Sequence, residues 1–313
     1  IMTKPSPEHV PVLLDETVTA LNIKPDGLYI DGTFGRGGHA RAILGELSSK
    51  GRVLGLDKDP EALEEGQDLA AKDERFTIEQ CSFAKLSDTV KTRFWQGKVD
   101  GILLDIGVSS PQLDIAERGF SFRKEGPLDM RMNPGEGKSA AEWLAYASMD
   151  EITTVLKTFG EERFGKRIAR AIVETRDASP LRTTKQLADL VDKASPFREK
   201  NKHPATRTFQ AIRIHINNEL DDLSLVLQQA IDVMAIGGRL TVISFHSLED
   251  RIVKRFFRDQ AKGDDLPAYF PITADQLNPS IKLIGKAIKS GEEELARNPR
   301  ARSAVLRVVE KIK

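Results

Sequence analysis

The stretch that most constrains the fold of this 313-residue chain is a short apolar run followed by an acid and a glycine-rich turn. The run is Leu28–Ile30, the acid is Asp31, and the turn contains Gly35, Gly37 and Gly38. The residues after the turn, 40–47, have the pattern of a helix. A strand, a glycine turn and a helix in this order form the first unit of a nucleotide-type α/β fold.

The acid at the end of the run bears on the ligand. The spacing of Gly35, Gly37 and Ala40 also fits the fingerprint of dinucleotide-binding proteins, so the glycines alone do not decide the ligand. A dinucleotide places its pyrophosphate at the helix N-terminus, where the carboxylate of Asp31 would repel it. S-adenosylmethionine (SAM) carries an ammonium, a sulfonium and a ribose but no phosphate. Asp31 therefore favours SAM, and the alternative is that it only caps the helix or supports the turn.

The alternation of strands and helices continues regularly from Gly27 to Val108. Further strands are predicted over 52–56, 76–79 and 99–106, with helices over 60–72 and 84–94. This pattern predicts a parallel sheet with helices on both faces, and such sheets bind ligands at the carboxyl ends of their strands. Asp57, Phe83 and Asp105 lie at or just after those ends. Three strand-end acids with an aromatic residue between them are better explained by one shared ligand than by separate helix caps.

A loop that contains Ser109-Ser110-Pro111-Gln112 follows the fourth predicted strand. Methyltransferases that act on the amino groups of bases carry an Asp/Asn/Ser-Pro-Pro-aromatic loop at this place, and Ser110 begins a loose relative of it. Acceptors on such a loop hold the hydrogens of the amine and aim its lone pair at the sulfonium methyl, which is positioning plus electrostatics. The alternative is an ordinary Ser-Pro turn.

The alternation stops after this loop and resumes near residue 216. Helices are predicted over 139–146, 149–159, 161–176, 184–194 and 204–216, the first with a capping box of Ser139 and Glu142. Between Lys157 and Arg213 basic residues outnumber acidic ones about two to one, although the whole chain has 47 of each. Beside a base-type methyl-transfer loop this bias indicates RNA contact, and the alternative is a solvated helical face. The predicted domains are an α/β core in two parts, 1–114 and 216–313, and a helical insert, 115–215.

The last part of the chain resumes the α/β pattern. It predicts a helix over 218–234, a turn over 235–238, a strand over 239–245, a helix opening at His246 and a final strand over 304–309. Residues 285–302 are expected to be rich in loops.

Composition excludes several classes of protein. Cys81 is the only cysteine, which rules out an internal disulfide and a cysteine-rich zinc site. The five histidines are far apart in sequence and form no ligand pair, so no metal is expected. No apolar run is long enough to span a bilayer and no signal peptide is seen, so we expect a cytoplasmic protein with no membrane partner.

Nine stretches, taken together, resemble the bacterial ribosomal RNA small subunit methyltransferase H family. They lie between His9 and Arg307 and are 9–16, 31–39, 105–114, 117–122, 126–132, 160–163, 203–214, 237–254 and 298–303. The resemblance implies a class I SAM-dependent methyltransferase, in which a Rossmann-like, doubly wound, mostly parallel sheet carries an inserted all-helical domain. It implies methyl transfer from SAM to the exocyclic N4 amine of a cytidine in the decoding region of small-subunit (16S) rRNA, numbered 1402 in the usual rRNA numbering.

The resemblance also assigns site residues. The family's cofactor positions fall on Gly37, Gly38, His39, Asp57, Phe83, Asp105 and Gln112, and the turn itself adds Asp31 and Gly35. Asp57 is expected to hold the ribose hydroxyls, Phe83 to flank the adenine unless it is core, and His39 to donate to the methionine carboxylate unless it has no partner. Asp105 and Ser110 are the predicted catalytic residues beside the amine. The predicted RNA contacts are Arg118, Arg123, Arg131, Arg163, Arg167, Arg170, His203 and Arg207.

The implied partner is small-subunit rRNA or the assembled small ribosomal subunit. The sequence leaves open which of the two is bound, and it leaves open the oligomeric state, a homodimer included. Ile236 stands where the family usually has proline and Phe159 where it often has tyrosine, both away from the predicted site. The sequence leaves two alternative functions open. One is a dehydrogenase, which Asp31 disfavours because it would repel the pyrophosphate of a dinucleotide, and the other is a non-enzymatic rRNA-binding assembly factor with a relic SAM fold.

Overall fold

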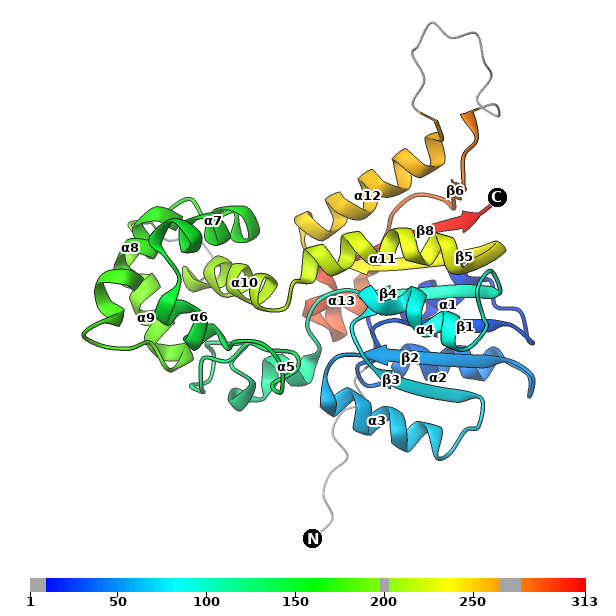
Figure 1. The fold of residues 1–313 in the computed structure, drawn as a ribbon, viewed down its shortest axis with the longest axis horizontal. Helices are drawn as coiled ribbons and strands as arrows, with labels where there is room; N and C mark the ends of the chain where they lie inside the picture. Colours follow the sequence, from blue (N-terminus) through cyan, green and yellow to red (C-terminus); the bar gives the residue numbers. More distant parts are fainter. Residues whose placement is uncertain (1–9, 198–202, 265–276) are drawn as a thin grey trace, which may run out of the picture. The chain divides into compact units, whose positions relative to one another are not determined.

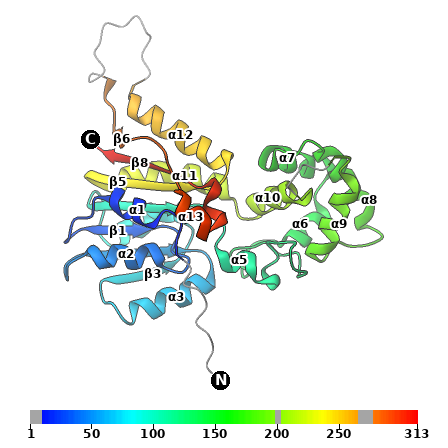
Figure 2. The ribbon, with the colours of Figure 1, turned by 180° about the vertical axis from the view of Figure 1, so that it is seen from behind.

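The computed structural model describes residues 10–197, 203–264 and 277–313, so His9, where the first of the nine stretches begins, lies outside the described residues. The chain divides into two compact units, Ile1–Gly107 with Asp221–Lys313, and Val108–Leu220. The sequence predicted boundaries at 114/115 and 215/216. Because the first observed boundary lies between Gly107 and Val108, the loop of Ser110 and Gln112 belongs to the second unit and not to the first. Figures 1 and 2 show the elements of each unit from opposite sides.

A mostly parallel sheet forms the centre of the first unit. Its strands are β1 (Leu28–Asp31), β2 (Arg52–Asp57), β3 (Phe76–Gln80), β4 (Val99–Asp105), β5 (Met234–Ser244), β6 (Ile281–Leu283), β7 (Ile288–Lys289) and β8 (Val305–Lys311). The order is β3-β2-β1-β4-β5-β8-β6, with β7 also paired to β8. Strands β1 to β5 are parallel, and β8 is antiparallel to its neighbours. One reversed strand beside the fifth parallel strand is typical of class I methyltransferases, so the predicted fold class is confirmed.

Helices cover both faces of this sheet, as the alternation predicted. On one face α4 (Leu86–Thr92), α11 (Glu219–Val233) and α12 (Ser247–Lys262) share an apolar cluster with Ile102 and Leu104 of β4. On the other face lie α1 (Leu14–Leu21), α2 (Gly38–Glu46) and α3 (Pro60–Ala70), while Leu103 of β4 joins a separate cluster. Successive side chains of a strand point to opposite faces, so the apolar run of β4 contributes to both clusters.

The second unit is helical and has its own core. Its helices are α5 (Ser110–Asp114), α6 (Ala140–Tyr146), α7 (Met149–Gly160), α8 (Gly165–Arg176), α9 (Thr184–Ala194) and α10 (Ala205–Ile216). Ser139 caps α6 and the side chain of Glu142 returns the bond, which confirms the predicted capping box. Leu144, Ile168 and Phe209 belong to a cluster of buried residues separate from those of the first unit. No helix in the described part of the chain is long and apolar enough to cross a membrane.

Several predicted element boundaries are wrong for local reasons. Helix α8 begins at Gly165 and not at Glu161, because Glu161 adopts a φ of +49° at the end of α7. Arg163 therefore lies in the turn before the helix. Strand β5 begins at Met234, and the predicted turn is an irregularity within the strand, where the register against β4 shifts and Gly237 has a φ of +83°. Strands β6 and β7 and helix α13 (Glu292–Arg297) have no counterpart among the predicted elements.

Candidate active site

Three carboxyl groups mark the carboxyl edge of adjacent strands in the first unit. Asp31 ends β1, Asp57 ends β2 and Asp105 ends β4. Strand β1 lies between β2 and β4 in the sheet, so the three strand ends are neighbours. The structure therefore brings these predicted site residues to one edge, as the parallel alternation required.

Asp31 is buried and only partly satisfied. Its Oδ1 accepts the N–H of Thr33 at 3.1 Å, while its Oδ2 is buried without a hydrogen-bond partner among the described residues. The pKa of Asp31 is raised to about 7, mainly by burial and also by the nearby charge of Asp57. A buried carboxylate oxygen without a donor is costly, so this position suits a cationic ligand group.

Asp57 fixes the glycine-rich turn. Its Oδ2 accepts the N–H of Gly35 at 2.8 Å and its Oδ1 accepts that of Asp59 at 3.0 Å. Burial raises the pKa of Asp57 to about 6, against the effect of these two bonds. Gly37 has a φ of +69°, and a Cβ on it would lie 2.4 Å from the ring of Phe34. The turn therefore requires glycine for its backbone conformation and for its packing.

His39 lies in the first turn of α2 and is buried. Its Nε2 is 3.2 Å from the carbonyl oxygen of Val12, and its Nδ1 is 3.9 Å from Oδ2 of Asp105. Burial lowers the pKa of His39 to about 4, so the ring is neutral near pH 7 and donates its one proton to the carbonyl. Nδ1 is then an acceptor. This geometry favours a structural tie to the N-terminal segment over the predicted donation to a methionine carboxylate.

Of the three strand-end acids, Asp105 has the most strongly raised pKa. Its backbone N–H donates to Oγ1 of Thr33 at 2.7 Å, which joins β4 to the glycine turn. Its Oδ1 is buried and has no hydrogen-bond partner in the described part of the chain. The pKa of Asp105 is raised to about 8, mainly by burial of the carboxyl and also by the charges of Asp31 and Glu249. Without a bound cation the side chain is therefore mostly protonated near pH 7.

Glu249 is a fourth acid at this edge, and sequence reasoning missed it. It lies in the first turn of α12, is 0% exposed, and accepts the N–H of Phe245 at 2.8 Å and that of His246 at 3.3 Å. Nε2 of His246 lies 2.8 Å from its Oε1. The available signal was the run His246-Ser247-Leu248-Glu249 directly after a strand, the same strand–turn–helix arrangement that pointed to Asp31.

Phe83 follows β3 and is half-buried against the core of the first unit. A Cβ built on Gly32 would lie 3.5 Å from the Cβ of Phe83, so the aromatic residue sits beside the strand end of Asp31. Ser82 caps the short turn that contains Phe83 and donates to Oδ2 of Asp222 at 2.7 Å. Lys58, directly after Asp57, binds the same Asp222 oxygen at 2.9 Å. These contacts hold the segments after β2 and β3 together.

The loop residues Ser110 and Gln112 belong to the second unit. Ser109 caps α5 and receives the N–H of Gln112, while Oε1 of Gln112 accepts the N–H of Ser109 at 3.0 Å. Gln112 is buried, so one certain task of its amide is to close this capping box. Ser110 is the first residue of α5. Their roles in cofactor binding and catalysis stay predictions.

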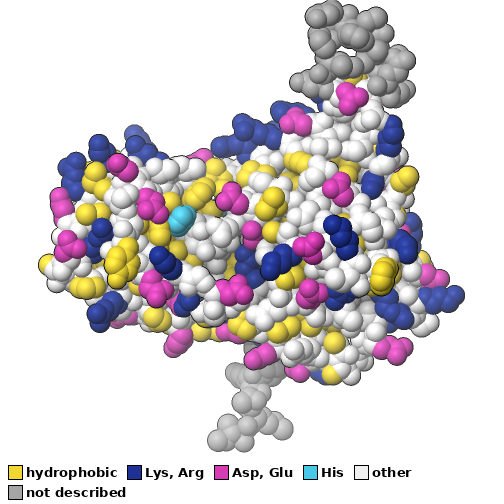
Figure 3. All heavy atoms as spheres, in the orientation of Figure 1, with side chains coloured by type: hydrophobic (Ala, Val, Ile, Leu, Met, Phe, Trp, Pro, Cys, Tyr) yellow, Lys and Arg dark blue, Asp and Glu magenta, His cyan; other side chains and the backbone are white. Residues whose placement is uncertain are grey.

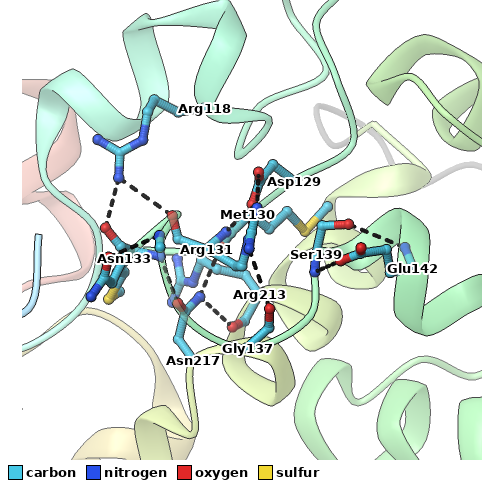
Figure 4. A network of polar contacts seen from close by, with 12 residues as sticks. Arg118, Asp129, Met130, Arg131, Asn133, Gly137, Ser139, Glu142, Arg213 and Asn217 are labelled. Atoms are coloured by element: carbon cyan, nitrogen blue, oxygen red, sulfur yellow. Dashed lines mark hydrogen bonds and ion pairs between the residues drawn. The ribbon is translucent and has the colours of Figure 1, made fainter.

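Two of the predicted RNA-binding arginines are engaged inside the second unit (Figure 4). Arg118 is only 7% exposed, and its Nη2 donates to the carbonyl oxygens of Arg131 and Met132 at 3.3 and 2.9 Å. The guanidinium of Arg131 binds both carboxylate oxygens of Asp129 at 2.8 Å. This arrangement favours structural roles for Arg118 and Arg131 over the RNA contacts that the sequence predicted.

Asn217 completes the same network. Its Nδ2 donates to the carbonyl of Met130 and its Oδ1 accepts the N–H of Met132, both at 2.8 Å. One side chain at the end of α10 thus satisfies two backbone groups of a buried irregular segment (Figure 4).

The other predicted RNA contacts are more open. Arg123, Arg163, Arg167 and Arg170 are exposed. None of the last three forms an ion pair with another described residue. Arg163, His203 and Arg207 line one pocket of about 40 Å³ in the second unit. The structure thus brings three cationic or ionisable side chains together, although Arg207 also donates to the carbonyl of Glu161 at 2.8 Å.

Comparison with known proteins decides the family. The model of the MraW methylase family matches residues 6–312. The chain belongs to the MraW methylase family. Three relatives share the name Ribosomal RNA small subunit methyltransferase H. They come from Thioalkalivibrio sulfidiphilus (57% identical over 310 residues, 99% of each chain), Nitrosococcus oceani (60% over 304 residues, 97% of this chain and 96% of the relative) and Pseudoalteromonas atlantica (56% over 308 residues, 98% and 99%).

Membership of the MraW methylase family confirms the resemblance seen in the sequence. As a MraW methylase with a class I fold, the chain takes its methyl group from SAM. The site fits this cofactor, because buried oxygens of Asp31 and Asp105 that no described donor satisfies lie at the ligand-binding edge of the sheet. A phosphate group would meet several carboxylates there, whereas an ammonium or a sulfonium would be stabilised.

Proposed function

We propose that this MraW methylase transfers a methyl group from SAM to the N4 amine of a cytidine in the decoding region of small-subunit rRNA, the one numbered 1402. The observation that carries the proposal is the group of carboxyls at the ends of β1, β2 and β4, Asp31 buried and Asp57 and Asp105 partly exposed, all three with raised pKa values, beside a turn that requires glycine. The shared name of the three relatives supports rRNA as the substrate class.

The first unit supplies most of the proposed cofactor contacts. Each Asp57 oxygen already accepts one backbone N–H and keeps a second lone pair, which would accept a ribose hydroxyl. The free oxygen of Asp31 would face the ammonium, and Phe83 would flank the adenine. Gly35, Gly37 and Gly38 let the backbone come close to the ligand. Gln112 would contribute from the second unit.

Asp105 and Ser110 are the proposed catalytic residues. Bound SAM supplies an electrophilic methyl group on a sulfonium. Asp105, at the end of β4, would accept a hydrogen bond from the amine and so help to point the nitrogen lone pair at the methyl carbon. Ser110 is the second proposed acceptor for the amine hydrogens. The cofactor would release this methyl group as the C–S bond breaks towards sulfur and the C–N bond forms. A positive ligand nearby would lower the pKa of Asp105, and the ionised carboxylate would take the proton that the amine releases.

The test is methyl transfer from isotope-labelled SAM to small-subunit particles and to naked rRNA, followed by mass mapping of the modified nucleotide. We expect N4-methylcytidine at the decoding region, and loss of most activity in Asp105→Asn. The same experiment tests the non-enzymatic alternative, because an assembly factor would bind the particle without transferring the labelled methyl group to it. A methyl group on another base or another atom would overturn the cytidine-N4 assignment.

A further inference from the structure

A row of exposed cations on α12 has no part in the function proposed so far. The helix follows β5 and carries Arg251, Lys254, Arg255, Arg258 and Lys262, all exposed. At 3.6 residues per turn these five positions fall within an arc of about 100°. Figure 3, in the orientation of Figure 1, shows Lys and Arg side chains on the part of the surface where α12 lies. We call these five residues the α12 row.

The opposite face of α12 fixes the direction of the row. Val253 and Phe257 are buried in the cluster that α12 shares with the sheet, and Ile252 and Phe256 pack against it half-buried. Burial of these large apolar side chains stabilises this orientation and so sets the rotation of the helix about its axis. The packing of the apolar face of α12 against the sheet therefore makes the α12 row point away from the sheet.

The acids of α12 leave the row positively charged. Glu249 is buried, and Asp250 accepts hydrogen bonds from the guanidinium of Arg307 at 2.7 and 3.1 Å. Asp259 is the one exposed acid of the helix, and its pair with Arg258 at 2.9 Å joins two well-exposed groups, so it contributes little. Lys254 and Arg255 form no ion pair with another described residue.

The α12 row starts next to the proposed methyl-transfer site. Strand β5 pairs with β4 so that Ile243 lies opposite Asp105, and α12 begins at Ser247, just after β5 ends. From Arg251 to Lys262 the helix advances about 16 Å, at roughly 1.5 Å per residue. A polyanion that leaves the carboxyl edge of β4 and β5 along this helix therefore meets positive charge over several of its phosphates.

We propose that the α12 row binds the phosphate backbone of the substrate RNA beside the nucleotide that is methylated. The inference rests on the proposed function and extends it, because every RNA contact predicted from the sequence lies in the second unit. RNA fits the row better than a protein partner does. Lys and Arg alone supply phosphate contacts, whereas protein interfaces depend on apolar and aromatic anchors, and α12 exposes none.

The experiment compares two triple variants of the full chain. The test variant is Lys254→Gln, Arg255→Gln and Arg258→Gln. The matched control is Lys50→Gln, Lys72→Gln and Lys91→Gln, which removes three exposed cations near the amino-terminal ends of β2, β3 and β4. The probe is an oligoribonucleotide with the decoding-region sequence, and its affinity is measured by fluorescence anisotropy at several salt concentrations.

We expect the test variant to bind this RNA roughly tenfold or more weakly near physiological salt, and the log–log salt slope to flatten by about 2, at about 0.7 per lost contact on a single strand. The control should match wild type, and SAM affinity and the melting curve should stay unchanged in both. The test variant should have a raised KM for RNA and, at saturating RNA, the wild-type kcat.

Equal RNA affinity and salt slope in the test variant and the control would overturn the proposal. Failure of the proposed function would look different, since wild type would then bind the RNA and transfer no methyl group to it.

Discussion

At the scale of single residues, Asp57 carries the clearest prediction for the cofactor. Asp57→Ala should weaken SAM binding by roughly 1.5–3 kcal/mol, the scale of a hydrogen bond to a charged group. The variant loses the proposed ribose acceptor and also the oxygens that hold the N–H groups of Gly35 and Asp59, so the glycine turn should loosen. Calorimetric titration with SAM measures the effect, and Asp68→Ala, an exposed acid on α3, is the control. Unchanged affinity would remove Asp57 from the site.

Asp105 makes stability depend on pH. Its pKa is raised from 3.8 to about 8, so the folded chain keeps a proton that the unfolded chain has lost between about pH 4 and pH 8. The free energy of unfolding that this group contributes is therefore present at low pH and falls as pH rises through that window. Asn cannot ionise. We expect apo Asp105→Asn to melt a few degrees above wild type at pH 8, on the scale of about 1–2 kcal/mol, with the gain shrinking as pH falls towards 4. A gain that does not change with pH would show that charge is not its cause.

The sequence located the strand-end acids but not every group that acts with them. Asp31, Asp57 and Asp105 could be predicted because the end of a parallel strand is visible as the end of an apolar run. Glu249 could not, because its burial depends on how α12 packs on the sheet. Arg118 was predicted to contact RNA from its charge alone. The sequence does not reveal that its guanidinium binds two backbone carbonyls within the second unit.

At the scale of elements, the cations at the start of α8 and along it carry a prediction for RNA binding. Changing Arg163, Arg167 and Arg170 together to Ala should weaken RNA binding, and each lost phosphate contact should lower the magnitude of the log–log salt slope by about 0.7–0.9. SAM affinity should stay the same, because the proposed cofactor contacts lie outside α8. Anisotropy across a salt series and calorimetry with SAM measure the two effects.

The control for this variant is a thermal melt, because arginine stems also pack against their neighbours. If the variant melts like wild type and also binds RNA with the wild-type affinity and salt slope, the cations of α8 form a solvated surface that does not contact RNA. The RNA path in the second unit would then be sought along the loop that carries the exposed Arg123.

Periodicity predicted most elements well, and its failures have physical causes. Strands β1 to β4 and helices α6, α7 and α9 follow apolar patterns long enough to read. Strands β6 and β7 have three and two residues, too few for an alternating pattern to show. The start of α8 was predicted four residues too early, because Glu161 takes a left-handed conformation that its residue type does not predict.

At the scale of the whole molecule, the two units have separate cores, and each holds one of the two tryptophans. Trp95 packs against a cluster of the first unit, and Trp143 belongs to the cluster of the second. Single-tryptophan variants, Trp143→Phe and Trp95→Phe, therefore report the unfolding of each unit by fluorescence. A ligand that binds one unit stabilises that unit alone unless the two unfold together.

We expect SAM to act mainly on the first unit, since Asp31, Asp57, Phe83 and Asp105 all belong to it. At a hundred times its Kd, SAM should stabilise the unit that binds it by about 2.7 kcal/mol, which raises the midpoint seen by Trp95 by roughly 5–10 °C. The midpoint seen by Trp143 should rise much less, by the amount that Gln112 and its loop contribute. Equal shifts of both signals would mean that the units unfold as one cooperative body. A larger shift of the Trp143 signal would move the cofactor site to the second unit, against the position of the strand-end acids.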